Sequence, residues 1–239
     1  IDFDRLFGAD FLEKCKTPVK LISRSDMATI DGKYEAIVCQ TAFPYMENLS
    51  KTKIISMQYS MSKELHQYGP WRALCDLNLV YGSYSEERIS YFGPCEKVGN
   101  PRFDRWFSGA LNQAQKGKIK NFLSDAKRTV LYLPTWGNLS SISQFATSIS
   151  ELSDHYNIIT KVHHKTDSHE LDKRSSLSEK GIRTTFGASD DLLYLLDAAD
   201  VVLSDFSGAI FDAINVQKPV ILLQKDVHIL IGAEKFGLE

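Results

Sequence analysis

Residues 190–223 constrain the fold more than any other part of this 239-residue chain. Their sequence, DDLLYLLDAADVVLSDFSGAIFDAINVQKPVILL, contains two short apolar runs, residues 201–203 and 220–223, that are typical of buried strands. Apolar residues at helical spacing precede the first run and separate it from the second. We therefore predict helix, strand, tight turn, helix and strand, which is the repeating unit of a parallel α/β sheet.

The turn after the first of these strands carries Ser204, Asp205, Ser207 and Gly208. A small polar residue and a glycine at a helix N-terminus present backbone N–H groups and the positive end of the helix dipole, so the turn can bind phosphate without a basic side chain. A structural role is the alternative, in which Ser207 caps the helix and Gly208 allows close packing. Asp212 follows one helical turn later, where its carboxylate can reach ribose hydroxyls or complement the dipole.

Composition describes an ordinary globular protein, with 43% hydrophobic and 24% charged residues and a formal net charge of -2. This charge gives no reason to expect a nucleic-acid partner. The four cysteines are scattered without a CxxC pair, which favours a reducing, cytoplasmic compartment. No apolar run approaches the ~20 residues of a membrane helix, and we expect no signal peptide. The chain starts with Ile1 and has few elements at either end, so we expect both ends to be truncated.

Apolar runs alternate with helical patterns along the whole chain, which predicts βα units around parallel sheets. The predicted strands are residues 19–22, 34–40, 53–58, 77–81, a piece near Lys97, 129–133, 157–162, 182–184, 201–203 and 220–223. The predicted helices include residues 10–15, 70–75, 84–91 and 113–125. A Gly/Pro-rich turn at residues 98–102 predicts a boundary between an incomplete first domain, residues 1–104, and a second domain, residues 105–239.

Ligands of parallel sheets bind at the carboxyl ends of strands. In the second half, such ends lead into Pro134, Thr135 and Trp136, and into His163, with Lys161 near the end of the preceding strand. Strand alternation predicts that His163 shares a face with Lys161 and that His164 points to the other face, so at most one histidine lines the site.

Each of these residues also has a plain structural interpretation. His163 fits a satisfied polar residue at a strand end, and Trp136 fits either a base-stacking residue or an ordinary packed loop residue. Two adjacent histidines without HExxH spacing make a poor zinc site. A cation held by Asp205 and Asp212 is no better supported than a turn cap and a helix carboxylate. We expect neither a metal nor a cofactor.

Several motifs together resemble the CDP-glycerol glycerophosphotransferase family of teichoic acid and capsule synthesis. They are LPTWG at residues 133–137, KVHH at 161–164, DLLYLLDAADVVLSDFSGAIFD at 191–212, KPVIL at 218–222 and VGNPRFD at 98–104. The resemblance implies a GT-B-like architecture of two facing doubly wound, Rossmann-like domains with parallel sheets. It also implies a nucleotide-linked donor on the second domain, an acceptor on the first, no obligatory metal, and work on the cytoplasmic face of a bacterial membrane with peripheral contact.

Carried over by position, the resemblance implies that Ser207 and Gly208 hold the donor pyrophosphate, that Thr135 and Asp212 lie near the nucleoside, and that His163 approaches the phosphates. Members of the family usually carry a WHG-like histidine in the first domain, a candidate base for the acceptor hydroxyl. This chain instead reads MQYSMSKE at residues 57–64. Either Glu64 or His66 therefore takes the role of base, or the protein transfers a group other than glycerol phosphate.

The leading hypothesis is a transferase that moves a glycerol-phosphate-type group from CDP-glycerol to a cell-surface polymer or a lipid-linked acceptor. Within enzymes, the alternatives are a GT-B glycosyltransferase that uses a CMP- or UDP-linked sugar in capsule or lipopolysaccharide synthesis, and a non-hydrolysing epimerase of UDP-N-acetylglucosamine. A non-catalytic nucleotide-binding or assembly domain is the alternative from another class.

Overall fold

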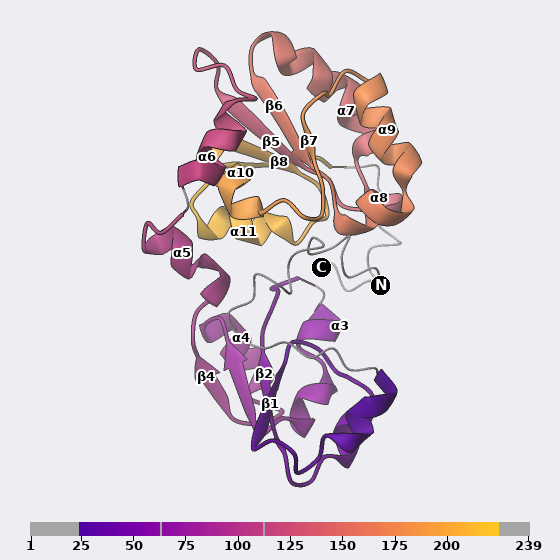
Figure 1. The fold of residues 1–239 in the computed structure, drawn as a ribbon, viewed down its shortest axis with the longest axis vertical. Helices are drawn as coiled ribbons and strands as arrows, with labels where there is room; N and C mark the ends of the chain where they lie inside the picture. Colours follow the sequence, from indigo (N-terminus) through magenta and orange to yellow (C-terminus); the bar gives the residue numbers. More distant parts are fainter. Residues whose placement is uncertain (1–23, 63, 112, 225–239) are drawn as a thin grey trace. The chain divides into compact units, whose positions relative to one another are not determined.

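The computed structural model describes residues 24–62, 64–111 and 113–224 (Figure 1). These residues form two compact units that divide between Asp104 and Arg105. Each unit contains one sheet, and both sheets are wholly parallel, which confirms the predicted α/β class. The strand predicted at residues 19–22 and the helix predicted at residues 10–15 lie outside the described residues.

The first unit, residues 24–104, is built on four strands in the order β1-β2-β3-β4. These are β1 (Ala36–Cys39), β2 (Lys53–Met57), β3 (Leu77–Val80) and β4 (Cys95–Lys97). The connections contain α3 (Glu64–Gln67), α4 (Ser83–Ile89) and the 3-10 helices η2 (Met46–Asn48) and η3 (Pro70–Leu74). The 3-10 helix η1 (Arg24–Thr29) precedes β1, and η4 (Pro101–Phe103) follows β4. Two small apolar clusters stabilise the unit, one around Ile54 of β2 and one around Val80 of β3.

The second unit, residues 105–224, has five strands in the order β7-β6-β5-β8-β9. These are β5 (Thr129–Leu133), β6 (Asn157–Lys161), β7 (Thr185–Phe186), β8 (Val201–Ser204) and β9 (Val220–Leu222). The α-helices are α5 (Asp104–Phe107), α6 (Gln113–Lys120), α7 (Ile142–Glu151), α8 (His164–His169), α9 (Leu171–Glu179), α10 (Leu192–Ala198) and α11 (Ala209–Asn215), with 3-10 helices η5 (Gly137–Leu139) and η6 (Leu152–Asp154).

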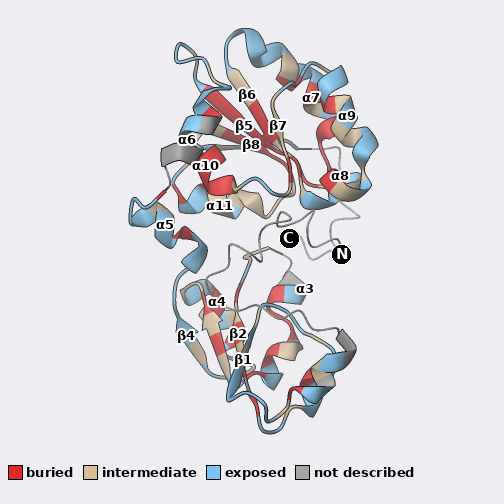
Figure 2. Ribbon diagram, viewed as in Figure 1, coloured by how far each residue is buried: buried red, intermediate tan, exposed pale blue. Residues whose placement is uncertain are grey.

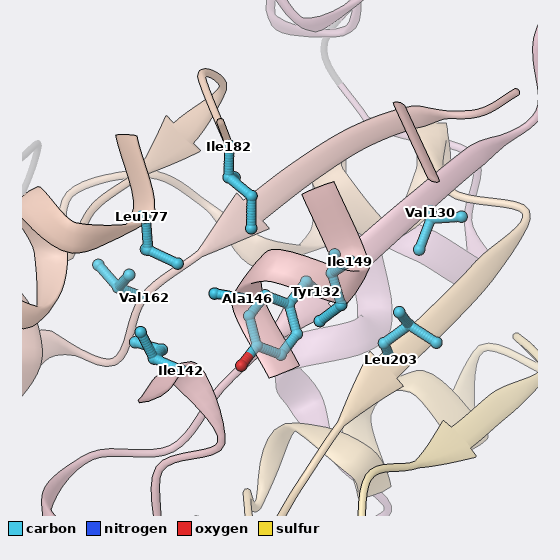
Figure 3. Packing of buried hydrophobic residues seen from close by; sticks show 9 residues of the cluster. All are labelled: Val130, Tyr132, Ile142, Ala146, Ile149, Val162, Leu177, Ile182 and Leu203. Atoms are coloured by element: carbon cyan, nitrogen blue, oxygen red, sulfur yellow. The ribbon is translucent and has the colours of Figure 1, made fainter. Parts of the chain in front are cut away.

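Strand β5 lies at the centre of this second sheet, and all five of its residues are buried (Figure 2). Helices α7 and α9 lie on one side of the sheet, and α6, α10 and α11 lie on the other (Figure 1). A continuous apolar run suits a strand that is covered on both faces. On the α7 and α9 side, Val130 and Tyr132 of β5 pack with Ile149 of α7 and Leu177 of α9 (Figure 3).

Most predicted strands begin and end within two residues of the observed ones. The strand predicted at residues 182–184 is wrong, because β7 starts at Thr185 and Ile182 is instead a buried loop residue of the α7–α9 core. The helix predicted at residues 70–75 is the 3-10 helix η3, and the one predicted at residues 113–125 ends at Lys120. Helices α7, α8 and α9 were not predicted. None of the helices in the described residues has the length and apolar character that crossing a membrane requires.

Candidate functional site

The carboxyl ends of β5, β6 and β8 lie side by side at one edge of the second sheet. The three strands are parallel, and β5 pairs with β6 on one side and with β8 on the other. The polar segments that follow Leu133, Lys161 and Ser204 therefore all leave the sheet at the same edge, which is where parallel sheets bind their ligands.

The segment after β8 enters α11 through Ser207 and Gly208. Gly208 is the N-cap, and the Ser207 hydroxyl accepts a hydrogen bond from the Ala209 N–H at 3.3 Å. The N–H groups of Ile210 and Phe211 bond to the carbonyls of Ser207 and Gly208. Within the described part of the chain, no hydrogen bond is found for the N–H groups of Ser207 and Gly208 themselves. These two half-buried residues retain backbone donors that a ligand can use.

Ser204 and Asp205 are predicted ligand-binding residues, but the structure buries both side chains. The Ser204 hydroxyl donates to the Leu133 carbonyl at 2.8 Å. The Asp205 carboxylate accepts hydrogen bonds from the Thr135 N–H at 2.7 Å, the Ser141 N–H at 2.8 Å and the Ser141 hydroxyl at 2.6 Å. Direct contact of these two side chains with a ligand stays a prediction. These side chains hold the loop after β5, because a buried carboxylate needs several donors to offset its desolvation.

The loop after β5 is held from a second direction by Glu170. Pro134 and Thr135 are buried, Trp136 is half-buried, and Gly137 has a φ of +67°, in the left-handed region that favours glycine. The Gly137 N–H donates to the Glu170 carboxylate at 3.1 and 3.3 Å. Although partial burial opposes it, hydrogen bonds from Lys173, Thr166 and Gly137 hold the pKa of Glu170 below its usual value, so the carboxylate is charged at neutral pH.

The segment after β6 brings His163 against Trp136. The two rings are stacked, with centroids 6.0 Å apart and planes at 28°, and the Lys165 ammonium lies 3.7 Å from the Trp136 centroid. His163 is the N-cap of α8, and its Nδ1 accepts the Lys165 N–H at 3.2 Å. A neutral imidazole whose Nδ1 accepts a hydrogen bond carries its proton on Nε2.

The predicted separation of the two histidines onto opposite faces is wrong. Strand β6 ends at Lys161, so alternation does not extend to His163 and His164, whose ring centroids lie 4.1 Å apart. The Lys161 ammonium donates to the Gly187 carbonyl and so holds the loop after β7. Asp212 lies half-buried in the first turn of α11, as predicted from helical spacing.

In the first unit, the two candidate bases lie on α3, which follows β2. The Glu64 side chain lies outside what the structure describes. His66 is exposed, and its Nε2 lies 3.0 Å from the Thr41 hydroxyl at the carboxyl end of β1. Gln58, directly after β2, is buried, and its side chain accepts the Tyr81 N–H at 2.8 Å and donates to the Ser60 carbonyl at 2.9 Å. Gln58 therefore supports neighbouring loops instead of presenting a titratable group at this strand end.

Sequence reasoning missed Glu170 and Lys173, although both contact the loop after β5. Glu170 lies at the junction of α8 and α9, two helices that were not predicted. A charged residue in a polar helical stretch carries no local signal that distinguishes an inward-facing carboxylate from a solvated one.

Solved structures of related fold support this architecture. A wall teichoic acid polymerase, TagF, in a histidine-to-asparagine variant soaked with CDPG, matches at 18% identity with a TM-score of 0.60 over 82% of this chain and 55% of that one. MnaA of S. aureus with UDP matches at 14% identity and a TM-score of 0.59 over 91% of this chain and 69% of that one. The UDP-GlcNAc 2-epimerase of Neisseria meningitidis bound to UDP-GlcNAc matches at 14% identity and a TM-score of 0.56, over 94% and 73%.

These likenesses confirm the predicted GT-B-like α/β class. The chain spans little more than half of the TagF structure, 55% of its length. A sequence model of the family described as CDP-glycerol:poly(glycerophosphate) glycerophosphotransferase matches residues 84–231. The chain therefore belongs to this family of transferases, as its motifs indicate. A comparison with curated protein sequences finds no match.

Proposed function

We propose that this chain is part of a transferase that moves a polyol phosphate group, of the glycerol phosphate type, from a CDP-linked donor to a hydroxyl of a bacterial cell-surface polymer. The observation that carries the proposal is the edge of the second sheet, where adjacent strands lead into the Trp136–His163 stack and the Ser207–Gly208 turn. Membership of the glycerophosphotransferase family and the fold shared with TagF support the same donor class. The proposal includes a lipid-linked or polymeric acceptor and peripheral membrane contact.

On the donor side, the proposed roles follow from the hydrogen-bonding capacity of each group. The N–H groups of Ser207 and Gly208 donate to the pyrophosphate, and α11 adds a modest positive potential. His163 donates from Nε2 to the phosphate that leaves with CMP, because its Nδ1 already accepts the Lys165 N–H. Asp212 addresses the ribose hydroxyls. Fixed donors aimed at developing charge lower a barrier by about 3 kcal/mol each.

The proposed reaction is a direct phosphoryl transfer. The acceptor oxygen bonds to the phosphorus that carries the glycerol, and the bond from this phosphorus to the bridging oxygen of CMP breaks. The acceptor proton passes to a base, and CMP leaves with the electron pair and the negative charge. We assign the base to His66 or, as the alternative, to Glu64, and a positioned base contributes about 100-fold or more.

A double substitution, Ser207→Ala with Gly208→Pro, tests the phosphate site. Gly208 has a φ of −59°, which proline adopts, so the variant removes its N–H with little strain. We expect calorimetric titration to show binding of CDP-glycerol, CDP and CMP to the unaltered chain and loss of that binding in the variant, with an unchanged circular dichroism spectrum. Ser178→Ala on the exposed side of α9 is the control. Unchanged affinity in the double variant would refute the phosphate site.

A second candidate function has its own support, because the two UDP-containing structures match 91% and 94% of this chain. A GT-B transferase or epimerase that uses a UDP-linked sugar predicts tighter binding of UDP and UDP-N-acetylglucosamine than of the cytidine nucleotides. Product analysis separates the classes, since they yield a phosphodiester, a glycoside or a free epimer. A non-catalytic domain predicts nucleotide binding without turnover.

A further inference from the structure

The two ends of α8 hold two successive residues of the loop after β5. At the N-terminal end, the His163 ring stacks on Trp136. At the C-terminal end, Glu170 accepts the N–H of Gly137. Since α8 has only six residues, a single short helix positions both the Trp136–His163 stack and the backbone of Gly137.

Glu170 is well placed to fix this loop. Its carboxylate also accepts the Thr166 hydroxyl at 2.9 Å and the Lys173 ammonium at 2.7 Å. The same Lys173 ammonium donates to the Gly137 carbonyl at 2.8 Å. Both polar backbone groups of Gly137 are therefore held by one ion pair, whose side chains are only 29% and 20% exposed. Charge-assisted hydrogen bonds of this kind are stronger than those between neutral groups.

We propose that Glu170, with Lys173, is a positioning residue that holds Trp136 and Gly137 so that Trp136 packs on His163 and directs the His163 Nε2–H toward the donor phosphate. The inference rests on the proposed function, because it explains how that donor site is ordered. Asp205 holds Thr135 and Ser141 on either side of the same loop. Asp205 and Glu170 together leave Trp136 little freedom to move before the donor arrives, and such preorganisation increases affinity.

The test compares Glu170→Gln with Glu179→Gln, an exposed glutamate at the end of α9 that serves as the matched control. Glutamine keeps the shape of Glu170 but loses the charge and the ion pair with Lys173. The chain has three tryptophans. In a Trp71→Phe, Trp106→Phe background the fluorescence of the free chain therefore reports on Trp136 alone. Calorimetry on the unaltered background measures the Kd for CDP-glycerol and for CMP.

We expect Glu170→Gln to make Trp136 more accessible to acrylamide quenching. We also expect the Kd for CDP-glycerol to rise about tenfold, which corresponds to the loss of one charge-assisted hydrogen bond. The donor KM should rise similarly with little change in kcat, because Glu170 does not touch the reacting atoms. Lys173→Met should shift both readouts in the same direction, and it replaces Glu170→Gln if that variant fails to fold. Glu179→Gln should behave as the unaltered chain.

Failure of this inference and failure of the proposed function give different results. Unchanged quenching and unchanged affinity in Glu170→Gln would overturn the positioning role, and so would a change in quenching without a change in affinity. If the unaltered chain binds UDP-linked but not CDP-linked ligands, the proposed donor is wrong. The positioning role is then decided by the effect of Glu170→Gln on UDP affinity. If the unaltered chain binds none of these nucleotides, both proposals are overturned.

Discussion

The two units support the loops at the carboxyl ends of their strands in different ways. In residues 105–224, carboxylates accept backbone N–H groups, as Asp205 does for Thr135 and Glu170 does for Gly137. In residues 24–104, the amide of Gln58 does the comparable work after β2 and also lies 3.3 Å from the Tyr68 hydroxyl. Ionised acceptors form shorter and stronger hydrogen bonds than neutral ones.

The buried polar side chains of Arg72 and Asp205 differ in how completely they are hydrogen-bonded. Arg72 of the first unit is fully buried, and it donates from Nε to the Gln67 carbonyl at 2.9 Å and from one terminal nitrogen to the Ser56 hydroxyl at 2.6 Å. Among the described residues, its other terminal nitrogen and both amide atoms of Gln67 have no hydrogen-bond partner. In the second unit, the buried Thr160 hydroxyl also has no hydrogen-bond partner among the described residues. Both carboxylate oxygens of Asp205, however, accept bonds from backbone or hydroxyl donors.

This difference fits the roles proposed for the two units. A nucleoside diphosphate carries charges at fixed positions. A site whose backbone donors are already held in place binds it at low entropic cost. We therefore infer that the second unit, where carboxylates hold the loops after the strands, is the more rigid at the carboxyl ends of its strands. Substitutions that act unequally on the two units test this difference.

The largest effect is expected from Asp205→Asn. Asparagine replaces one acceptor oxygen with an NH₂ group that faces N–H donors, so buried donors lose their partner and the free energy of unfolding falls by about 3 kcal/mol. Urea denaturation measures the loss, and hydrogen exchange over residues 134–141 localises it. Asp172→Asn, at an exposed position of α9, is the control. A loss below about 1 kcal/mol would mean that the carboxylate does not fix this loop.

A smaller, pH-dependent effect is expected from Asp31→Asn in the first unit. The N–H groups of Lys51, Thr52 and Ser50 donate to this carboxylate and lower the pKa of Asp31 to about 2. A pKa lowered by folding stabilises the folded state above the unfolded pKa, and this stability is lost as pH falls from about 4 through about 2. The variant should lack that part of the acid unfolding curve.

Acid titration followed by circular dichroism makes this measurement. Glu35→Gln, at an exposed position next to β1, is the control and should retain the full pH dependence. If Asp31→Asn and the unaltered chain lose stability in parallel between pH 4 and 2, the carboxylate does not contribute in the folded state.

The smallest effect is expected from Arg72→Met, although Arg72 is among the most buried side chains. A buried cation with an unpartnered nitrogen recovers little of its desolvation energy. Removing it should offset the loss of its donors to the Gln67 carbonyl and the Ser56 hydroxyl, so Met should change the free energy of unfolding by no more than about 1 kcal/mol. Urea denaturation, with Arg102→Met as the exposed control, measures it. A loss above about 3 kcal/mol would show that the guanidinium is required and that the two units do not differ in this respect.

Local pattern was sufficient for most of the fold. Strand β5 was predicted with its observed bounds, because a strand buried on both faces is a continuous apolar run. The end of β6 was placed one residue late, and that error assigned strand geometry to His163 and His164, which cap and begin α8. The edge strand β7 was misplaced because Ile182 was interpreted as a strand residue. Ile182 is instead a loop residue that packs in the core.

The candidate site could also be predicted only in part. Strand ends that meet at one edge follow from a parallel sheet, so the segments around Trp136, His163 and Ser207 could be predicted from the order of elements. The order of elements could not predict which side chains of those segments remain available to a ligand. Ser204 and Asp205 are as polar as Ser207, but only the structure shows that the first two are buried.

The sequence by itself determined the α/β class, the position of nearly every described strand and the family, because apolar periodicity and short motifs are properties of neighbouring residues. Only the tertiary structure decided that the carboxylates of Asp205 and Glu170 hold the loop after β5. Their bonds join residues 70 and 33 positions apart in the chain. Such contacts exist only once the sheet and helices are assembled, since the burial that makes a carboxylate seek backbone donors is created by folding.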